Sequence, residues 1–187
     1  MQPWDFIVIR DAAIRRAVQS NFDQANRQAA MAYADQRRAL YDGLKLAAIL
    51  DAPVNLCITC DQERQRGGGL GRQSIPATAV YSTVCAVQNL WLAARAEGLG
   101  AGWVSILDLE NLRGVLGIPE HVIPVAYLCL GYVSEFDARP ELEQRGWESR
   151  EALNNLIHFD RWGEQDPLRA SALLDSVSKS TSKSTNG

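Results

Sequence analysis

Ser105 is the residue of this chain whose type and position most readily suggest chemistry. It follows a glycine-rich run, residues 98–102, and the pair Trp103 and Val104. Its hydroxyl could contact a ligand held over the glycine turn, or it could pair with backbone in a strand, and the spacing favours neither. No Gly-x-Ser-x-Gly motif surrounds it, so the sequence does not indicate a nucleophile elbow.

Two glycine-rich runs invite a nucleotide-binding interpretation, and neither meets the motif. Residues 67–71 lack the Gly-Lys-Ser/Thr ending of a phosphate-binding P-loop. Residues 98–102 follow a predicted helix rather than a strand, and Trp103 stands where the dinucleotide-binding motif needs a third small residue. The sequence therefore predicts neither a P-loop nor a Rossmann-type site.

The four cysteines and two histidines do not predict a metal or redox site. Cys57 and Cys60 have a redox-like spacing, but side chains three residues apart in a strand point to opposite faces, so the thiols should diverge. We expect both to be buried structural residues. His121 and His158 are far apart and lack a His-Glu-x-x-His context, so we expect them at the surface and predict no metal.

The composition is that of an ordinary globular domain. The 187 residues are 47% hydrophobic and 22% charged, which suffices for one substantial core. A net charge of −3 gives no electrostatic reason to expect a nucleic-acid partner. No apolar run reaches membrane-spanning length and the start is no signal peptide, so we expect a cytoplasmic location and no membrane partner. Arg37 and Arg150 are isolated basic residues, for which a solvated surface position is the default.

The elements that must position Ser105 are a long helix and a short extended run. Residues 79–97 predict a helix that is apolar on almost all sides, which implies burial in a core or a subunit interface. The helix feeds the glycine-rich turn and then an extended segment up to Ile106. Such a turn suits a flat ligand lying against the backbone, so this segment is where we expect the function.

The remaining elements interleave helices and strands without a strict βαβ rhythm, which favours an α+β fold. Asp11 is a plausible N-cap for the first helix, and Asp108 for a later one. Pro53 should end the second helix, because the residue before a proline leaves the helical region. The predicted strands are 6–10, 54–60 and 122–133, and the predicted helices are 11–26, 28–50 and 109–116.

We divide the chain into a domain over residues 1–166 and a polar, disordered tail over residues 167–187. Residues 61–78 form a polar, glycine-rich loop whose length is typical of functional or mobile segments. Residues 134–166 turn polar and resemble an arm that packs over a surface. The end of the chain is rich in Ser, Thr and Lys and has no apolar pattern.

Several runs together resemble the nitroreductase superfamily. The resemblance extends from Gln2 to about Trp162 and is most specific to a branch that consumes its own flavin. The Gln-Pro-Trp start is general to the superfamily, whereas the Tyr-Ser-Thr-Val-Cys and Gly-Trp-Val-Ser-Ile runs are specific to that branch. The runs that carry the resemblance are Gln2–Phe6, Tyr81–Trp91, Gly98–Ile106, Leu116–Val122 and Ala126–Val133.

The resemblance implies a fold, a cofactor and a reaction. It implies a nitroreductase-like α+β fold with a central mixed sheet flanked by helices, which works as an intertwined homodimer and binds FMN at the subunit interface. In the branch concerned, reduced FMN reacts with O2, and the isoalloxazine is fragmented to 5,6-dimethylbenzimidazole, the lower ligand of cobalamin (vitamin B12), and a four-carbon sugar phosphate. A separate flavin reductase supplies the reduced FMN.

The resemblance also implies which residues bind the flavin. Ser105 matches a serine implicated in catalysis near the reactive face of the ring. Arg37 and Leu46 match positions in a helical excursion that closes over the flavin. Arg150 matches a basic residue expected near the FMN phosphate. The segment expected to line the ring is Trp103, Val104, Ser105 and Ile106.

The chain departs from the family pattern at two places. Glu148 stands where the arm usually carries a second basic residue. The family begins upstream of Gln-Pro-Trp with an Arg-Arg-Asp-x-Arg segment that binds the phosphate and supplies a catalytic aspartate, whereas this chain begins at Met1. We therefore expect an N-terminally truncated start, weak FMN binding and slow turnover. A generic FMN-dependent NAD(P)H nitroreductase and a catalytically impaired flavin-binding protein are the alternatives.

Overall fold

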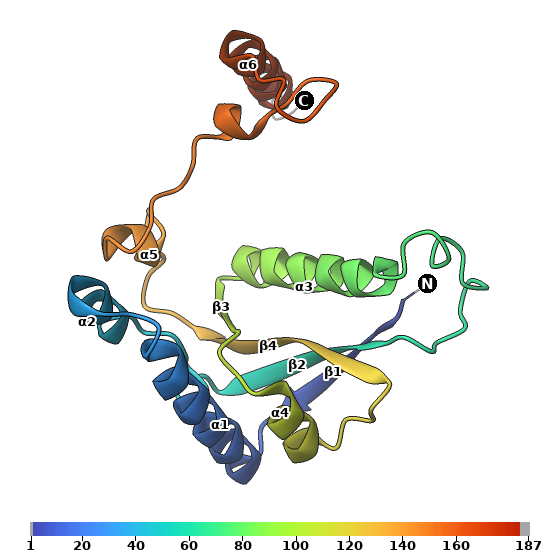
Figure 1. Cartoon of the computed structure of the whole chain (residues 1–187), viewed down its shortest axis with the longest axis vertical. Helices are drawn as coiled ribbons and strands as arrows, with labels where there is room; N and C mark the ends of the chain where they lie inside the picture. Colours follow the sequence, from blue (N-terminus) through green and yellow to red (C-terminus); the bar gives the residue numbers. More distant parts are fainter. Residues whose placement is uncertain (1, 184–187) are drawn as a thin grey trace. The chain divides into compact units, whose positions relative to one another are not determined.

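The computed structural model describes residues 2–183, with the surroundings of side chains given up to residue 176, and it divides into two compact units, Met1–Ala138 and Arg139–Gly187. The first unit contains a four-stranded sheet in the order β1-β2-β4-β3 (Figure 1). The strands are β1 (Trp4–Ile9), β2 (Val54–Asp61), β3 (Leu99–Val104) and β4 (Val122–Tyr132).

All three pairings between the described strands are antiparallel, which corrects the expectation of a mixed sheet. β2 and β3 run in the same direction, because each is antiparallel to β4. They do not pair, since β4 lies between them. The order of the strands, rather than their directions, therefore excludes a parallel pair.

Helices cover both faces of the sheet (Figure 1). Helix α3 (Thr78–Ala96) packs on one face, where Val87 joins Leu56 and Ile58 of β2. Helices α1 (Ala12–Ala30) and α4 (Leu109–Leu116) pack on the other, where Cys57 and Tyr127 belong to the larger core. Because successive side chains of a strand point to opposite faces, β2 contributes to both layers.

Most of the predicted elements of the first unit are present, and their caps have a physical basis. The Asp11 carboxylate accepts hydrogen bonds from the amides of Ala13 and Ile14 at the start of α1. The Asp108 carboxylate accepts a hydrogen bond from the amide of Asn111 at the start of α4. This helix is capped at its other end by Gly117, whose backbone is in the left-handed conformation with φ 66°. Both capping predictions are confirmed.

The predicted helix over residues 28–50 is wrong. Helix α1 continues to Ala30, only Asp35–Asp42 form α2, and residues 43–53 are irregular. The break has a backbone cause: Ala34 is extended, with φ −126° and ψ 166°, and Asp35 has a φ of 45°. Gly43 then caps α2. The irregular segment that follows becomes part of the candidate site.

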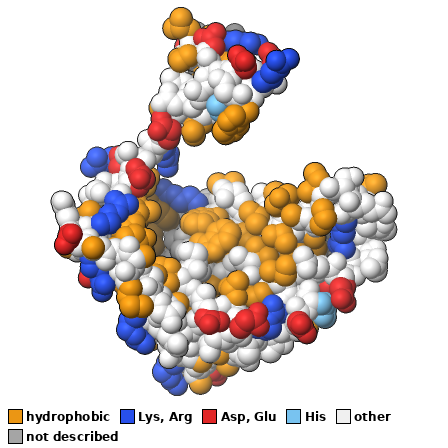
Figure 2. All heavy atoms as spheres, in the orientation of Figure 1, with side chains coloured by type: hydrophobic (Ala, Val, Ile, Leu, Met, Phe, Trp, Pro, Cys, Tyr) orange, Lys and Arg blue, Asp and Glu red, His pale blue; other side chains and the backbone are white. Residues whose placement is uncertain are grey.

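Helix α3 is buried on one side only within the described residues. Thr83, Val87 and Ala94 face the sheet, whereas Tyr81 and Leu92 are each 59% exposed. Figure 2 shows hydrophobic side chains gathered along α3 on the face of the first unit in view. The sequence predicted a helix buried on several sides, whereas the described elements of the first unit leave this face of α3 uncovered. No helix within residues 2–183 combines the length and hydropathy needed to cross a membrane.

The second unit contains α5 (Glu141–Gln144), a 3-10 helix η1 (Leu153–Leu156) and α6 (Pro167–Lys183). A disordered tail was predicted over 167–187, but α6 occupies most of that range; residues 184–187 lie outside the described residues. The Asp166 carboxylate accepts hydrogen bonds from the amides of Leu168 and Arg169, which caps the helix. Ala170 is fully buried, and the Arg169 guanidinium lies over the ring of Phe159, so α6 packs within its own unit.

Candidate functional site

The candidate site lies where β3 ends beside the longer strand β4. Trp103 and Val104 are the last residues of β3 and pair with Leu128 and Tyr127 of β4. Beyond this point the chain leaves the sheet at Ser105, whereas β4 extends back to Val122, and no described strand pairs with it on that side. The unequal lengths of the two strands leave a recess at the edge of the sheet.

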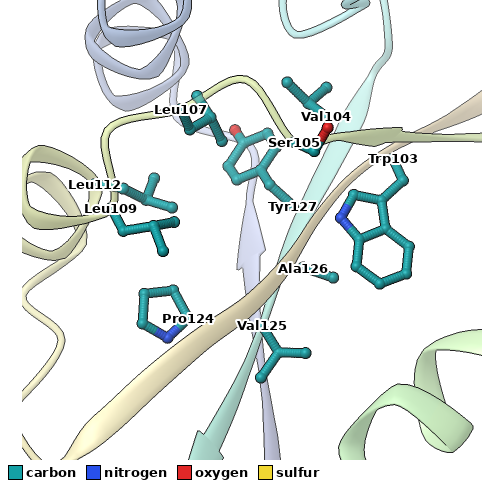
Figure 3. Close-up of a pocket in the computed structure, with 10 residues that line it drawn as sticks. All are labelled: Trp103, Val104, Ser105, Leu107, Leu109, Leu112, Pro124, Val125, Ala126 and Tyr127. Atoms are coloured by element: carbon teal, nitrogen blue, oxygen red, sulfur yellow. The ribbon is translucent and has the colours of Figure 1, made fainter. Parts of the chain in front are cut away.

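A pocket of about 310 Å³ occupies this recess (Figure 3). Its wall is mostly apolar, and Ser105, which is exposed, is the residue with a hydroxyl group at the end of β3 among those that line it (Figure 3). An apolar wall with few polar groups is the usual character of a small-molecule site. The lining residues are Trp103, Val104, Ser105, Leu107, Leu109, Leu112, Pro124, Val125, Ala126 and Tyr127.

Trp103 and Val104 also line a second pocket of about 170 Å³. Its other wall is the irregular segment Lys45–Ala48, which includes Leu46. The segment is fixed at its far end, because the Asn55 amide donates to the carbonyl of Ile49 and Arg15 donates to that of Ala52. The end of β3 therefore separates two recesses.

The structure brings four of the seven predicted site residues to these recesses: Leu46, Trp103, Val104 and Ser105. Ile106 is half-buried and packs against the larger core instead of lining either pocket. Arg37 is exposed on α2 and lines neither pocket. Arg150 belongs to the second unit, where its side chain is exposed.

Several residues that line the larger pocket carry no sequence motif that would assign them to a site. Leu109 and Leu112 belong to α4, and Pro124 to Tyr127 belong to β4, so both elements were predicted but not assigned to a site. Apolar residues of this kind give no signal of a pocket in one sequence. The signal available was Pro124, since a proline inside a strand marks a place where the ladder lacks a neighbour on one side.

Tyr127 is the polar residue that the pocket buries most deeply. It is 1% exposed, and its hydroxyl has no hydrogen-bond partner within the described part of the chain. Burial raises the pKa of Tyr127, and the neighbouring Cys129 and Cys57 thiols raise it further. The side chain is therefore neutral at ordinary pH and contributes its ring to the pocket wall.

Burial also makes two cysteine thiols of the core unreactive. Cys57 and Cys60 are fully buried and form no disulfide, as expected. Burial raises the pKa of the Cys57 thiol to about 12 and that of Cys129 to about 11. A thiolate is the nucleophilic form, so neither thiol is poised for redox chemistry.

The raised pKa of Cys57 predicts a loss of stability in alkali. Above about pH 9 the unfolded thiol ionises while the folded thiol stays protonated up to about pH 12, so the free energy of unfolding falls through this window. Urea unfolding at pH 8.5 and 10.5 should give a decrease larger by about 2 kcal/mol for the native chain than for Cys57→Ala. An equal decrease in both proteins would contradict the assignment.

No group of three or more His, Cys, Asp or Glu residues within the described part of the chain could hold a metal ion. His121 is partly exposed, with its Nε2 atom 4.0 Å from Oδ1 of Asp61. The ring of His158 lies tilted by 31° against that of Trp162, with 4.4 Å between centroids. His121 lies at the surface, as predicted, whereas His158 is half-buried.

The model of the nitroreductase family matches residues 1–132, which span the whole sheet and both pockets. The chain belongs to the nitroreductase family. Among curated proteins, this nitroreductase-family chain is 42% identical over 149 residues to a 5,6-dimethylbenzimidazole synthase of Rhodospirillum rubrum, covering 80% of this chain and 71% of that protein. It is 40% identical over 147 residues to the synthase of Rhodobacter capsulatus, covering 79% and 71%.

The solved structures agree on the fold. A crystal structure of iodotyrosine deiodinase bound to FMN and 3-iodo-L-tyrosine superposes with a TM-score of 0.62 at 16% identity, covering 86% of this chain and 78% of that one. This likeness establishes the nitroreductase fold and nothing finer. Together with the family match and the synthase relatives, it makes the chain an oxidoreductase enzyme with an α+β fold.

Proposed function

We propose that this chain is a 5,6-dimethylbenzimidazole synthase that fragments reduced FMN with O2 to supply the lower ligand of cobalamin. The observation that carries the proposal is the 42% identity over 149 residues to a protein of that activity. A distant relationship would support only a general nitroreductase function. Three synthases at 36–42% identity over about four fifths of the chain support the specific synthase activity.

The end of β3 fits an isoalloxazine ring. Trp103 and Val104 present apolar surface to two recesses, and Ser105 adds the hydroxyl that a polar edge of the ring needs. Reduced FMN supplies the electrons that O2 accepts in this reaction. The chain's own contribution is an apolar wall that excludes water and a fixed hydroxyl beside the ring. Ile106 would act through its backbone, since its side chain packs against the core.

The remaining flavin contacts are assigned on the family pattern. We place Leu46 against the ring, because it lines the second recess with Trp103. Arg37 lies on α2, ahead of the segment that includes Leu46, and belongs to the same excursion over the flavin. Arg150 would bind the phosphate, for which the guanidinium fork is well suited.

The exposed apolar face of α3 supports a homodimer. Tyr81, Val84, Cys85, Gln88 and Leu92 follow one another at helical spacing and are all exposed. They lie opposite the residues that face the sheet. A stripe of this kind on a helix is a common protein interface, and a second copy of the chain is the partner we propose. A flavin reductase would supply FMNH2, and the cytoplasm would be the site of both.

A comparison of two assays distinguishes this function from the alternatives. The chain is given NADPH and a nitroaromatic acceptor in one assay and chemically reduced FMN with air in the other. The proposal predicts 5,6-dimethylbenzimidazole in the second assay and little NADPH oxidation in the first. Rapid NADPH oxidation without the base would favour a generic nitroreductase. Tight FMN binding with neither activity would favour a flavin-binding protein.

A further inference from the structure

Asn21 is a buried polar residue on a helix that otherwise presents apolar side chains to the core. It is 5% exposed and lies on α1 next to Phe22 and one turn from Val18, both of which belong to the larger core. A buried amide costs free energy unless its donor and acceptor are both satisfied. Asn21 must therefore have specific partners.

Both partners belong to one residue far along the chain. The Asn21 Nδ2 atom donates to the carbonyl oxygen of Asp108 at 2.8 Å, and the Asp108 amide donates to Asn21 Oδ1 at 2.8 Å. The pair reproduces, with a side chain, the double hydrogen bond of two facing strand residues. The Asp108 carbonyl also accepts from the Leu112 amide, so the same residue begins α4.

Asp108 closes the short segment that contains Ser105. On one side, Val104 is fixed by its pairing with Tyr127 in the sheet. On the other side, Asp108 is fixed by Asn21. The three residues between these anchors belong to no strand or helix, and two of them, Ile106 and Leu107, pack against the core. Ser105 is the one that is exposed at the pocket.

We propose that Asn21 is the positioning residue that holds the Ser105–Asp108 segment in register with the flavin. This inference rests on the proposed function, because that function gives Ser105 its role. Asn21 itself is outside both pockets and acts through the backbone of Asp108. Losing the amide would free the second anchor and let the Ser105 hydroxyl move relative to the ring. A misplacement of about 1 Å can cost about 100-fold in rate.

The test compares three variants of the full chain. Asn21→Ala removes both hydrogen bonds, and Asn21→Asp keeps the acceptor for the Asp108 amide while losing the donor to its carbonyl. Val18→Ala, on the same helix face, creates a core cavity without touching Asp108. For each we would measure kcat and KM for reduced FMN, the visible circular dichroism of bound FMN, and amide hydrogen exchange over residues 105–108.

We expect kcat to fall by about 10- to 100-fold in Asn21→Ala, with KM changed by less than about threefold. Asn21→Asp should lie between this variant and the native chain. Exchange over 105–108 and the flavin dichroism should change with the Asn21 variants and not with Val18→Ala. If Asn21→Ala fails to fold, Asn21→Asp provides the same comparison.

Two results would overturn the inference. One is native kcat, exchange and dichroism in both Asn21 variants, and the other is an equal change in Val18→Ala. Failure of the proposed function gives a different outcome. In that case the native chain forms no 5,6-dimethylbenzimidazole, while exchange and dichroism still report whether Asn21 fixes the segment.

Discussion

Ser105→Ala should lower the rate of 5,6-dimethylbenzimidazole formation by about 100-fold while leaving FMN affinity within about threefold of the native value. Ser105 provides an exposed hydroxyl at a pocket whose wall is otherwise mainly apolar. Its removal leaves the shape of the pocket intact, because the apolar residues around it are held by β3, β4 and α4. The effect should therefore appear in kcat rather than in binding.

Single-turnover chromatography of the base, combined with a fluorescence titration of FMN, measures the two quantities separately. Ser105→Thr is the matched control, since it keeps a hydroxyl at the same position. We expect it to retain a larger share of the activity than the alanine variant. If the native chain and Ser105→Ala gave equal rates, Ser105 would have no part in the reaction, whatever the function of the chain.

A charge on the exposed face of α3 should separate the proposed dimer. Leu92 is 59% exposed in the described chain and lies on the stripe opposite the sheet-facing residues. In a dimer that buries this stripe, Leu92→Asp would place an unpaired carboxylate in an apolar interface. Burying an uncompensated charge costs several kcal/mol, so the dimer dissociation constant should rise by about 100-fold or more.

Sedimentation velocity over a range of concentrations measures that shift. Met31→Asp is the control, because Met31 is an exposed apolar residue at the end of α1 and off the α3 stripe. It should sediment as the native chain does. A native chain that stays monomeric at micromolar concentration, or a Leu92→Asp variant that dimerises normally, would contradict the assignment of this face.

Local sequence patterns predicted most helices and strands of the first unit, because helix caps and strand alternation depend on residues close together in the chain. The caps at Asp11 and Asp108 and the inert cysteines of β2 depend on neighbours within a few residues and on strand alternation. The prediction of one helix over 28–50 was wrong because the spacing of apolar residues does not show where the backbone breaks. Its break lies in the backbone at Ala34 and Asp35, where no proline or glycine marks the interruption.

The site was predictable only in part, since a pocket depends on which distant segments meet. The run from Trp103 to Ser105 was expected to be functional from the helix and glycine-rich turn that precede it, and its resemblance to the family assigned it to the flavin ring. Its neighbours from β4 and α4 were not assigned to a site, because apolar residues look alike in a sequence whether they line a pocket or fill a core. Asn21 gave no signal at all, because its partner lies 87 residues away. Only the folded chain connects it to Ser105.

The most direct test of the central proposal is the yield of base per flavin consumed in a single turnover. The full chain is mixed with a limiting amount of reduced FMN without oxygen, air is admitted, and FMN and 5,6-dimethylbenzimidazole are quantified by chromatography. If the chain is a synthase, base should appear as FMN disappears, and Ser105→Ala should slow both changes. Full recovery of oxidised FMN, with no base formed by the native chain, would contradict the proposal.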